Sequence, residues 1–330
     1  MRSQSWILLL SLISSSASVG QTPAQTPVRI PRDTFVAWMS RLSNAGRWGA
    51  ADQLGTLNLI TPAKRRAAAQ SVRDGASISL ARDLVAGPDS NAIRPMRFGL
   101  LVNRMDSTTT AALDSVVLLA HGYIYSHMDA LSHFLFRDRM YNDFARDQLV
   151  PEGAKKLGIE VMQDGIVTRG VLIDVPRLRG VPYLSNGDAV LPADLDLWEK
   201  RSGIRIEAGD VVLIRTGRGA RVDATGPWRV VANAAGPHPS LAAWLKSRDV
   251  AALGSDVANE VAPSVVPGFT NPMHLLSLIA MGMPLMDDLD LENLAKESAA
   301  RSRSTFLFVV APLRVRGGTG SPVNPLAIFH

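Results

Sequence analysis

The sequence contains no cysteine among its 330 residues. This absence excludes disulfide bonds, thiolate metal sites, iron–sulfur clusters and cysteine nucleophiles. The chain also lacks a Gly-x-Ser-x-Gly nucleophile elbow and a Walker phosphate loop. Histidine is scarce, with six residues. Any bound metal must therefore be held by a few histidines together with carboxylates or backbone oxygens.

Neither sign of charge dominates. The chain has 35 Lys and Arg against 30 Asp and Glu, a net charge of +5, and its basic residues are scattered. A nucleic-acid partner is therefore not expected. With 46% hydrophobic and 20% charged residues, the composition is that of a folded globular protein.

Long apolar runs are missing as well. The first apolar run, residues 6–13, follows Arg2 and precedes a stretch of small residues. It is shorter than the roughly 20 residues that span a bilayer, and this layout is typical of a secretory signal peptide. We therefore expect a signal peptide over 1–20 and a flexible tether over 21–31. The mature protein is expected to be exported, periplasmic or secreted, with no membrane association.

Helical and strand patterns alternate along the rest of the chain without a repeat or a clear linker, which predicts a single α/β domain over residues 32–330. Helices are expected over 33–44, from Pro62 to about 73, and over 192–201, 239–248 and 272–280. Strands are expected over 76–80, 166–175, 210–216, 250–254 and 305–310, with a buried strand over 115–120.

Three of the six histidines fall between positions 121 and 133, with one aspartate among them. In an extended segment His127 and Asp129 share one face, about 7 Å apart. A turn could bring His133 back over them. His121 has the right parity but lies ~20 Å away in an extended chain, so it can join only if the chain bends, which Gly122 permits.

Imidazole and carboxylate without thiolate suit Zn²⁺, Mn²⁺ or Fe²⁺ in a catalytic site. The alternative is a set of histidines that never meet. Downstream, Asp256, Glu260, Asp287 and Asp288 form a second group with His274, which is either a core residue of an apolar helix or a ligand. His238 is expected in a loop, and the segment 317–322 is expected to be a closely packed turn.

The segment Ser126-His-Met-Asp-Ala-Leu-Ser-His-Phe134 resembles the specific motif of the cyclase / metal-dependent hydrolase family, which includes bacterial kynurenine formamidase and isatin hydrolase. The resemblance covers most of the mature chain. It is supported by similar segments at 48–58, 209–217, 253–256, 274–294 and 311–325, of which the first and last are similar to a longer, less characterised branch.

The resemblance implies a swivelling β/β/α fold with a mixed sheet and flanking helices, and a homodimer. It also implies that His127, Asp129 and His274 are metal ligands and that His133 is the general acid and base. The family then expects an acidic residue where this chain has Met286, one position before Asp287.

Two other positions depart from the family pattern. The expected histidine before His127 is Tyr123, for which His121 is the nearest substitute, and the proline expected after Asp-Ala is Leu131. The number of ions, one or two of Zn or Mn, therefore stays open. So does the question of whether His121 and Asp287 reach the metal.

Taken with the family, these residues predict a metal-dependent hydrolase. A metal-activated water would attack the carbonyl of an amide, formamide, lactam or lactone, while His133 moves the proton. Tyr123, Tyr125 and Asn58 are candidates for binding the small-molecule substrate, and Asn324 is a weaker one. Asp256 is expected to hold either a loop or a histidine that binds the metal, and not the metal itself. Two alternatives remain, a metal-assisted isomerase or dehydratase and a non-catalytic exported binding protein.

Overall fold

The computed structural model describes residues 28–329, so the predicted signal peptide and most of the predicted tether lie outside it. Where the described chain begins, it packs against the body. The buried Ile30 donates its backbone N–H to the carbonyl of Val265, at 3.0 Å. No helix within the described residues combines the length and the apolar character that a membrane crossing requires.

The fold is built on a mixed nine-stranded sheet in the order β1–β15–β13–β7–β9–β11–β12–β4–β14. The central strands β7, β9, β11 and β12 run parallel, and the strands on both sides are antiparallel. The strands of this sheet are β1 (Ser77–Ser79), β4 (His127–Asp129), β7 (Ile166–Asp174), β9 (Val211–Arg215), β11 (Ala252–Ser255), β12 (Leu285–Asp287), β13 (Thr305–Val310), β14 (Gly320–Pro322) and β15 (Leu326–Ile328).

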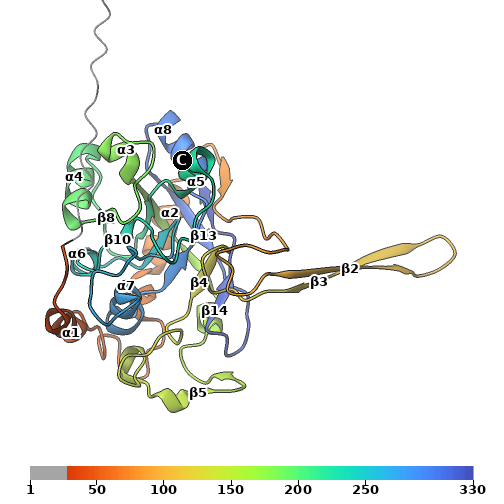
Figure 1. The fold of residues 1–330 in the computed structure, drawn as a ribbon, viewed down its shortest axis with the longest axis horizontal. Coiled ribbons are helices and arrows are strands. Elements are labelled where there is room, and N and C mark those ends of the chain that lie inside the picture. Colours follow the sequence, from red (N-terminus) through yellow and green to blue (C-terminus); the bar gives the residue numbers. More distant parts are fainter. Residues whose placement is uncertain (1–27, 330) are drawn as a thin grey trace, which may run out of the picture.

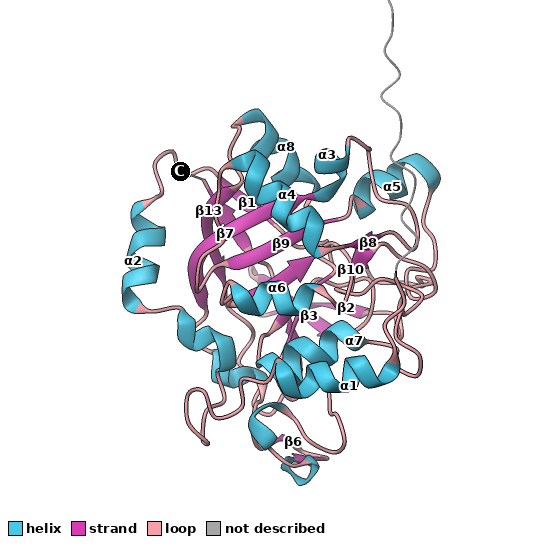
Figure 2. Cartoon of the chain, turned by 90° about the vertical axis from the view of Figure 1, so that its left-hand side faces the viewer, coloured by secondary structure: helices cyan, strands magenta, loops and turns pink. Residues whose placement is uncertain are grey.

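Every residue of β9, β11 and β12 is buried, as expected for parallel strands covered on both faces. Figure 2 shows the helices arranged around the sheet, and both α2 and α8 contact β7. The helices are α1 (Arg32–Arg41), α2 (Pro62–Gln70), α3 (Val175–Arg179), α4 (Pro192–Ser202), α5 (Arg218–Thr225), α6 (Leu241–Ser247), α7 (Pro272–His274), which continues into the π-helical segment η5 (Leu275–Met281), and α8 (Glu292–Ala300).

Local sequence signals explain several of these boundaries. The Thr61 side chain accepts a hydrogen bond from the N–H of Lys64, and Pro62 occupies the first helical position of α2, where it loses no hydrogen bond. Helix α4 ends at Gly203, whose φ of 69° lies in the left-handed region that favours glycine. The helices expected from Pro62 and over 192–201 are thereby confirmed.

A long hairpin of β2 (Arg97–Arg104) and β3 (Thr110–Val117) projects from the body (Figure 1). The strand expected over 115–120 does exist in part, but the prediction that it is buried is wrong. Val116 and Val117 are 50% and 54% exposed. Among the described residues β3 pairs only with β2, so no sheet or helix covers it.

Candidate metal centre

Strand β4 carries the first two candidate ligands and lies between β12 and β14. Its register places His127 opposite Asp287 and Met128 opposite Met286. Because side chains alternate along a strand, His127, Asp129 and Asp287 point to one face, while the two methionines are buried on the other. The sheet register thus brings Asp287, and not Met286, to the candidate site.

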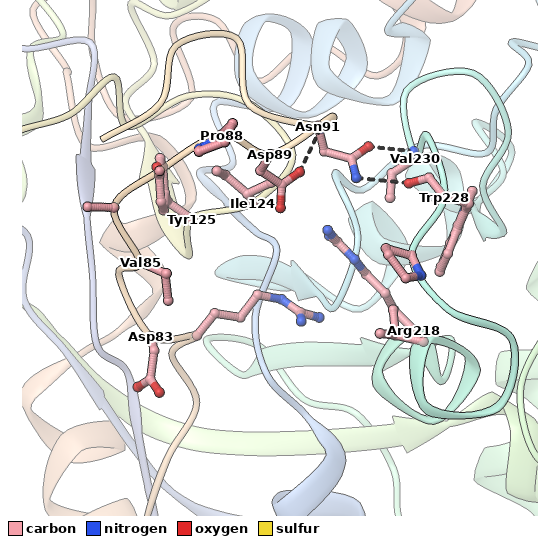
Figure 3. Close-up of a pocket in the computed structure, with 15 residues that line it drawn as sticks. Asp83, Val85, Pro88, Asp89, Asn91, Ile124, Tyr125, Arg218, Trp228 and Val230 are labelled. Carbon is pink, nitrogen blue, oxygen red and sulfur yellow. Dashed lines mark hydrogen bonds between the residues drawn. The ribbon is translucent and has the colours of Figure 1, made fainter. Parts of the chain in front are cut away.

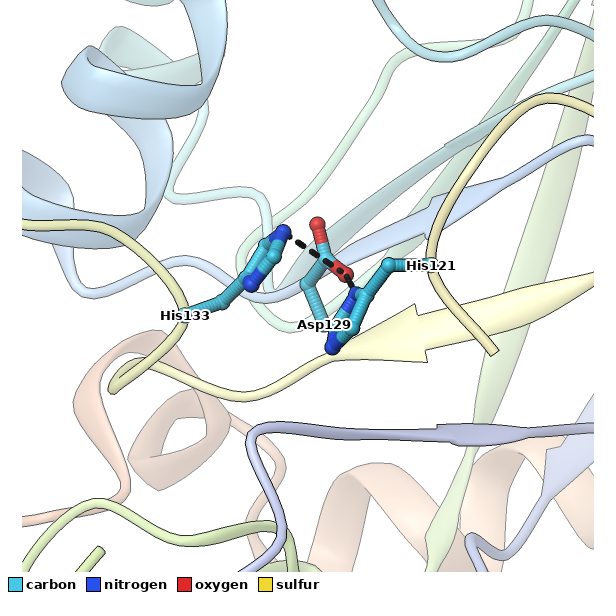
Figure 4. Close-up of side chains that lie close together, drawn as sticks. All are labelled: His121, Asp129 and His133. Carbon is cyan, nitrogen blue, oxygen red and sulfur yellow. Dashed lines mark hydrogen bonds and ion pairs between the residues drawn. The ribbon is translucent and has the colours of Figure 1, made fainter. Parts of the chain in front are cut away.

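His121 and His133 reach Asp129 from the two sides of β4. The His121 Nδ1 lies 3.0 Å from Asp129 Oδ1, and the His133 Nε2 lies 3.9 Å from the same oxygen (Figure 4). The two imidazole rings stack at a centroid distance of 3.7 Å. Gly122, with a φ of 139°, makes the bend that brings His121 back.

His274, at the end of α7, completes the cluster from the opposite side. Its Nδ1 donates to Glu260 Oε1 at 3.0 Å, and its Nε2 lies 3.2 Å from Asp287 Oδ2 and 3.6 Å from Asp129 Oδ2. The His274 ring thus faces two carboxylates and not only apolar side chains.

Burial and the concentration of charge shift the protonation of these groups. Burial would raise the pKa of Asp129, but the surrounding histidines, His133 foremost, hold it well below its usual value. Burial lowers the pKa of His133 to about 4, against the pull of Asp129. For His274 the opposite effect prevails. Burial would lower its pKa, but the carboxylates of Asp287 and Glu260 raise it well above 6.5.

Two overlapping sets of donor atoms lie close enough to hold a cation. One contains His121, Asp129 and His133, and the other contains His127, Asp129 and Asp287. Asp129 belongs to both, and its Oδ2 is buried without a hydrogen-bond partner among the described residues. A buried carboxylate oxygen without a partner is costly, and a bound cation would satisfy it.

Supporting residues fix the orientation of these side chains. His127 Nδ1 donates to the carbonyl of Tyr125 at 2.8 Å, which leaves Nε2 free to face the carboxylates. Asn259 donates to Asp287 at 2.5 Å, and the Thr319 hydroxyl lies 3.1 Å from His121 Nε2. Sequence reasoning missed Asn259 and Thr319, because an isolated amide or hydroxyl carries no pattern.

The segment expected to be a closely packed turn packs tightly, but only its first part is a turn, because residues 320–322 form strand β14, which pairs with β4. A Cβ on Gly320 would lie 2.5 Å from the His121 ring.

Asp256 holds a loop, as predicted: its carboxylate accepts hydrogen bonds from the backbone N–H groups of Thr216, Gly217 and Arg218, at the start of α5. Burial raises the pKa of the neighbouring Asp288 to about 6.

The candidate substrate residues lie in different surroundings. Burial, followed by the charge of Asp287, raises the pKa of the Tyr123 hydroxyl. The Tyr125 hydroxyl accepts a hydrogen bond from the N–H of Met96. Asn58 donates within its own loop, to Asp52 and Gly55, and Asn324 accepts from Ser79 at the other edge of the sheet. Neither asparagine has a hydrogen bond or ion pair with the cluster among the described residues.

A family model described as "Putative cyclase" matches residues 78–259, which is more than half of the chain. The protein therefore belongs to this cyclase family, as the motif around His127 indicated. No match is found among curated proteins.

Solved structures share the fold. A crystal structure of a protein described as a novel cyclase is 28% identical, with a TM-score of 0.78, and covers 87% of this chain and 98% of its own. Isatin hydrolase A from Ralstonia solanacearum is 23% identical, with a TM-score of 0.53, covering 80% of this chain and 94% of its own. Isatin hydrolase A from Labrenzia aggregata, bound to benzyl benzoate, is 20% identical, with a TM-score of 0.53, covering 79% and 95%. The expected mixed sheet with flanking helices is confirmed.

Proposed function

We propose that this protein is a metal-dependent hydrolase that cleaves an amide, formamide, lactam or lactone, most closely resembling an arylformamidase. The observation that carries the proposal is the buried Asp129, which four histidines surround while its Oδ2 has no hydrogen-bond partner among the described residues. The shared fold with two isatin hydrolases supports the same class of reaction.

The residues present fit a divalent ion, Zn or Mn. His127, Asp129, His274 and Asp287 would hold it, and His121 lies close enough to Asp129 to contribute. These are nitrogen and carboxylate donors, which such ions accept. Such an ion would lower the pKa of a water molecule and polarise the carbonyl of the substrate. The donor set of His127, Asp129 and Asp287 provides for one ion, and a second ion would use the set of His121, Asp129 and His133, which would make His133 a ligand as well.

His133 is proposed as the general base and acid. Its lowered pKa leaves the imidazole neutral near pH 7 and ready to accept a proton. Its ring is less buried than those of His127 and His274, with 23% of its side chain exposed, so a substrate can approach it. The protonated ring would then donate to the leaving nitrogen or oxygen, while Tyr123 lines the approach.

The first experiment is elemental analysis of protein purified without chelator or histidine tag. We expect about one or two equivalents of Zn or Mn per chain, lost in His127→Ala. His238→Gln is the matched control, since His238 is buried but bonds Ser240 and the carbonyl of Val28. A wild-type protein that neither contains nor takes up metal would contradict the proposal.

The second experiment separates the reaction types. Turnover of N-formylanilines, lactams and lactones in ¹⁸O-water should place one labelled oxygen in the acid product. Conversion without label would show an isomerase or dehydratase. His133→Ala should keep its metal and lose turnover by about 10²–10⁴-fold, whereas loss of the metal would make His133 a ligand.

We also propose that the protein is a homodimer. A two-stranded hairpin is marginal in water on its own, yet the β2–β3 hairpin exposes apolar side chains along its length. Leu100 and Val102 are 60% and 61% exposed. Sedimentation should show a dimer that Leu100→Glu/Val102→Glu dissociates, while Thr109→Glu at the turn does not. A double variant that remains dimeric would place the interface elsewhere.

We also propose that the protein is exported after removal of its signal peptide. The intact mass of protein recovered from the periplasm or medium should correspond to cleavage after Gly20 or Ala17. A full-length mass in the cytoplasm would contradict it.

A further inference from the structure

A cavity of about 320 Å³ lies beside the metal centre, at the carboxyl ends of the parallel strands (Figure 3). Arg218 follows β9, Asp256 follows β11 and Asp288 follows β12. Ligands of open α/β sheets commonly bind at this edge. None of the proposed metal ligands lines the cavity.

Two arginines converge at this cavity. Arg82 donates from Nε to the carbonyl of Asp288 and from Nη2 to the carbonyls of Asp256 and Leu289. Arg218 donates to the carbonyl of Asp256 and to the carboxylate of Asp288. Only Arg218 has an ion-pair partner among the described residues. The Asp256 carboxylate is already occupied by the start of α5.

Arg82 is half-buried and has no ion-pair partner among the described residues. Its Nε and Nη2 are committed to backbone carbonyls, and Nη1 has no hydrogen bond among the described residues, so Nη1 is the nitrogen left for a ligand. Burial, followed by the charge of Arg218, lowers the pKa of Arg82, while the carboxylates of Asp288, Asp256 and Asp290 raise it. Asp83 and Asp89 also line the cavity, but both are exposed, where solvent screens them. The two guanidinium groups favour an anion in this cavity.

The rest of the wall restricts what that anion can be. It is largely apolar, built by Val85, Ile124, Val222, Trp228 and Val230. We propose that this cavity is a binding site for a small organic monocarboxylate, whose carboxylate sits at Arg82 and Arg218 and whose apolar body lies against Trp228. A charge-assisted hydrogen bond from Arg82 Nη1 would hold the carboxylate, because such bonds are stronger than those between neutral groups.

The site is distinct from the metal centre but touches its supports. Arg218 Nη2 donates to the carbonyl of Tyr123, at 2.5 Å. The Tyr125 side chain lines the cavity, and its carbonyl holds His127. A bound carboxylate would thus lie against the chain segment that orients the proposed ligands, although binding itself needs no metal.

Benzoate is the probe, titrated calorimetrically into the full protein as purified and again after dialysis against chelator. We expect saturable binding of one benzoate per chain that survives removal of metal. Benzyl alcohol, of similar shape without the charge, should bind at least about tenfold more weakly. Inorganic phosphate at the same concentration should not displace benzoate. Complete displacement by phosphate would show a general anion site and would contradict specificity for a carboxylate.

Two variants locate the site. Arg82→Gln should weaken benzoate binding about tenfold or more, while the exposed Arg97→Gln on β2 should bind like wild type. Val222→Trp should block the cavity with both arginines intact. Unchanged binding in Val222→Trp, or binding that disappears with the metal, would overturn the inference. Neither result bears on the proposed hydrolysis, which is tested separately.

Discussion

The clearest energetic prediction concerns Asp256, which anchors the start of α5. Its Oδ1 accepts from the N–H and the hydroxyl of Thr216, at 2.8 and 2.9 Å, and its Oδ2 accepts from the N–H groups of Gly217 and Arg218, at 2.8 and 3.0 Å. In Asp256→Asn the amide oxygen can keep one of these pairs. If the amide oxygen keeps Gly217 and Arg218, the Thr216 hydroxyl can turn to accept from the new NH₂ group, but the Thr216 N–H faces a donor and loses its acceptor.

A buried donor without an acceptor costs about 1–3 kcal/mol, so the substitution should destabilise the fold by about 2 kcal/mol. That is a large part of a typical net stability of about 5–15 kcal/mol. Urea unfolding at pH 7, with m-values compared, measures the difference. Asp223→Asn, an exposed position on the same helix, is the control and should change stability by less than about 0.5 kcal/mol. A loss below about 1 kcal/mol in Asp256→Asn would refute the reasoning.

Three further predictions follow from single contacts. Burial lowers the pKa of His238, so the folded state prefers its neutral form. This stability is present above about pH 6.5 and declines as the pH falls below it, because the unfolded chain binds the proton more readily; thermal melts from pH 7 to 5 should fall less steeply in His238→Gln. Gly320→Ala should push the His121 ring from its position, since the new Cβ would lie 2.5 Å away; elemental analysis and a crystal structure would show the displacement, and an unmoved ring would contradict it. Glu260→Gln removes the carboxylate that holds His274 Nδ1 and should weaken metal affinity by about 10–100-fold in a chelator competition.

Much of the metal centre could be predicted from the sequence because its first part is local. His127 and Asp129 lie two residues apart in an extended segment, and strand geometry alone places them on one face. His133 follows Asp129 by four residues, after a turn of the chain. Nothing beyond the next few residues was needed for these three.

The remaining members depend on long-range pairing that no local pattern encodes. Whether Asp287 or Met286 faces the site is decided by the register of β12 on β4. His121 arrives only because the chain bends at Gly122. Asn259 and Thr319 were missed for the same reason, since each is a single polar residue whose partner lies far away in sequence.

The hairpin shows a different reason for error. Residues 115–117 have the β-branched and apolar character of a buried strand, and the propensity for a strand was correct. Propensity describes the strand, however, and not what covers it. The same apolar side chains are consistent with burial in a core and with burial against a second chain, so the sequence alone does not distinguish the two.

The position of β4 in the sheet has a consequence for when the candidate metal centre can form. β4 lies between β12 and β14, which come from a much later part of the chain. The contact from Ser126 to Asp288 spans 162 positions. The metal centre therefore closes only after nearly all of the chain has been synthesised and has folded. If the chain folds after export, the identity of the bound metal would depend on the ions available outside the cytoplasm and not on those available where the chain is synthesised.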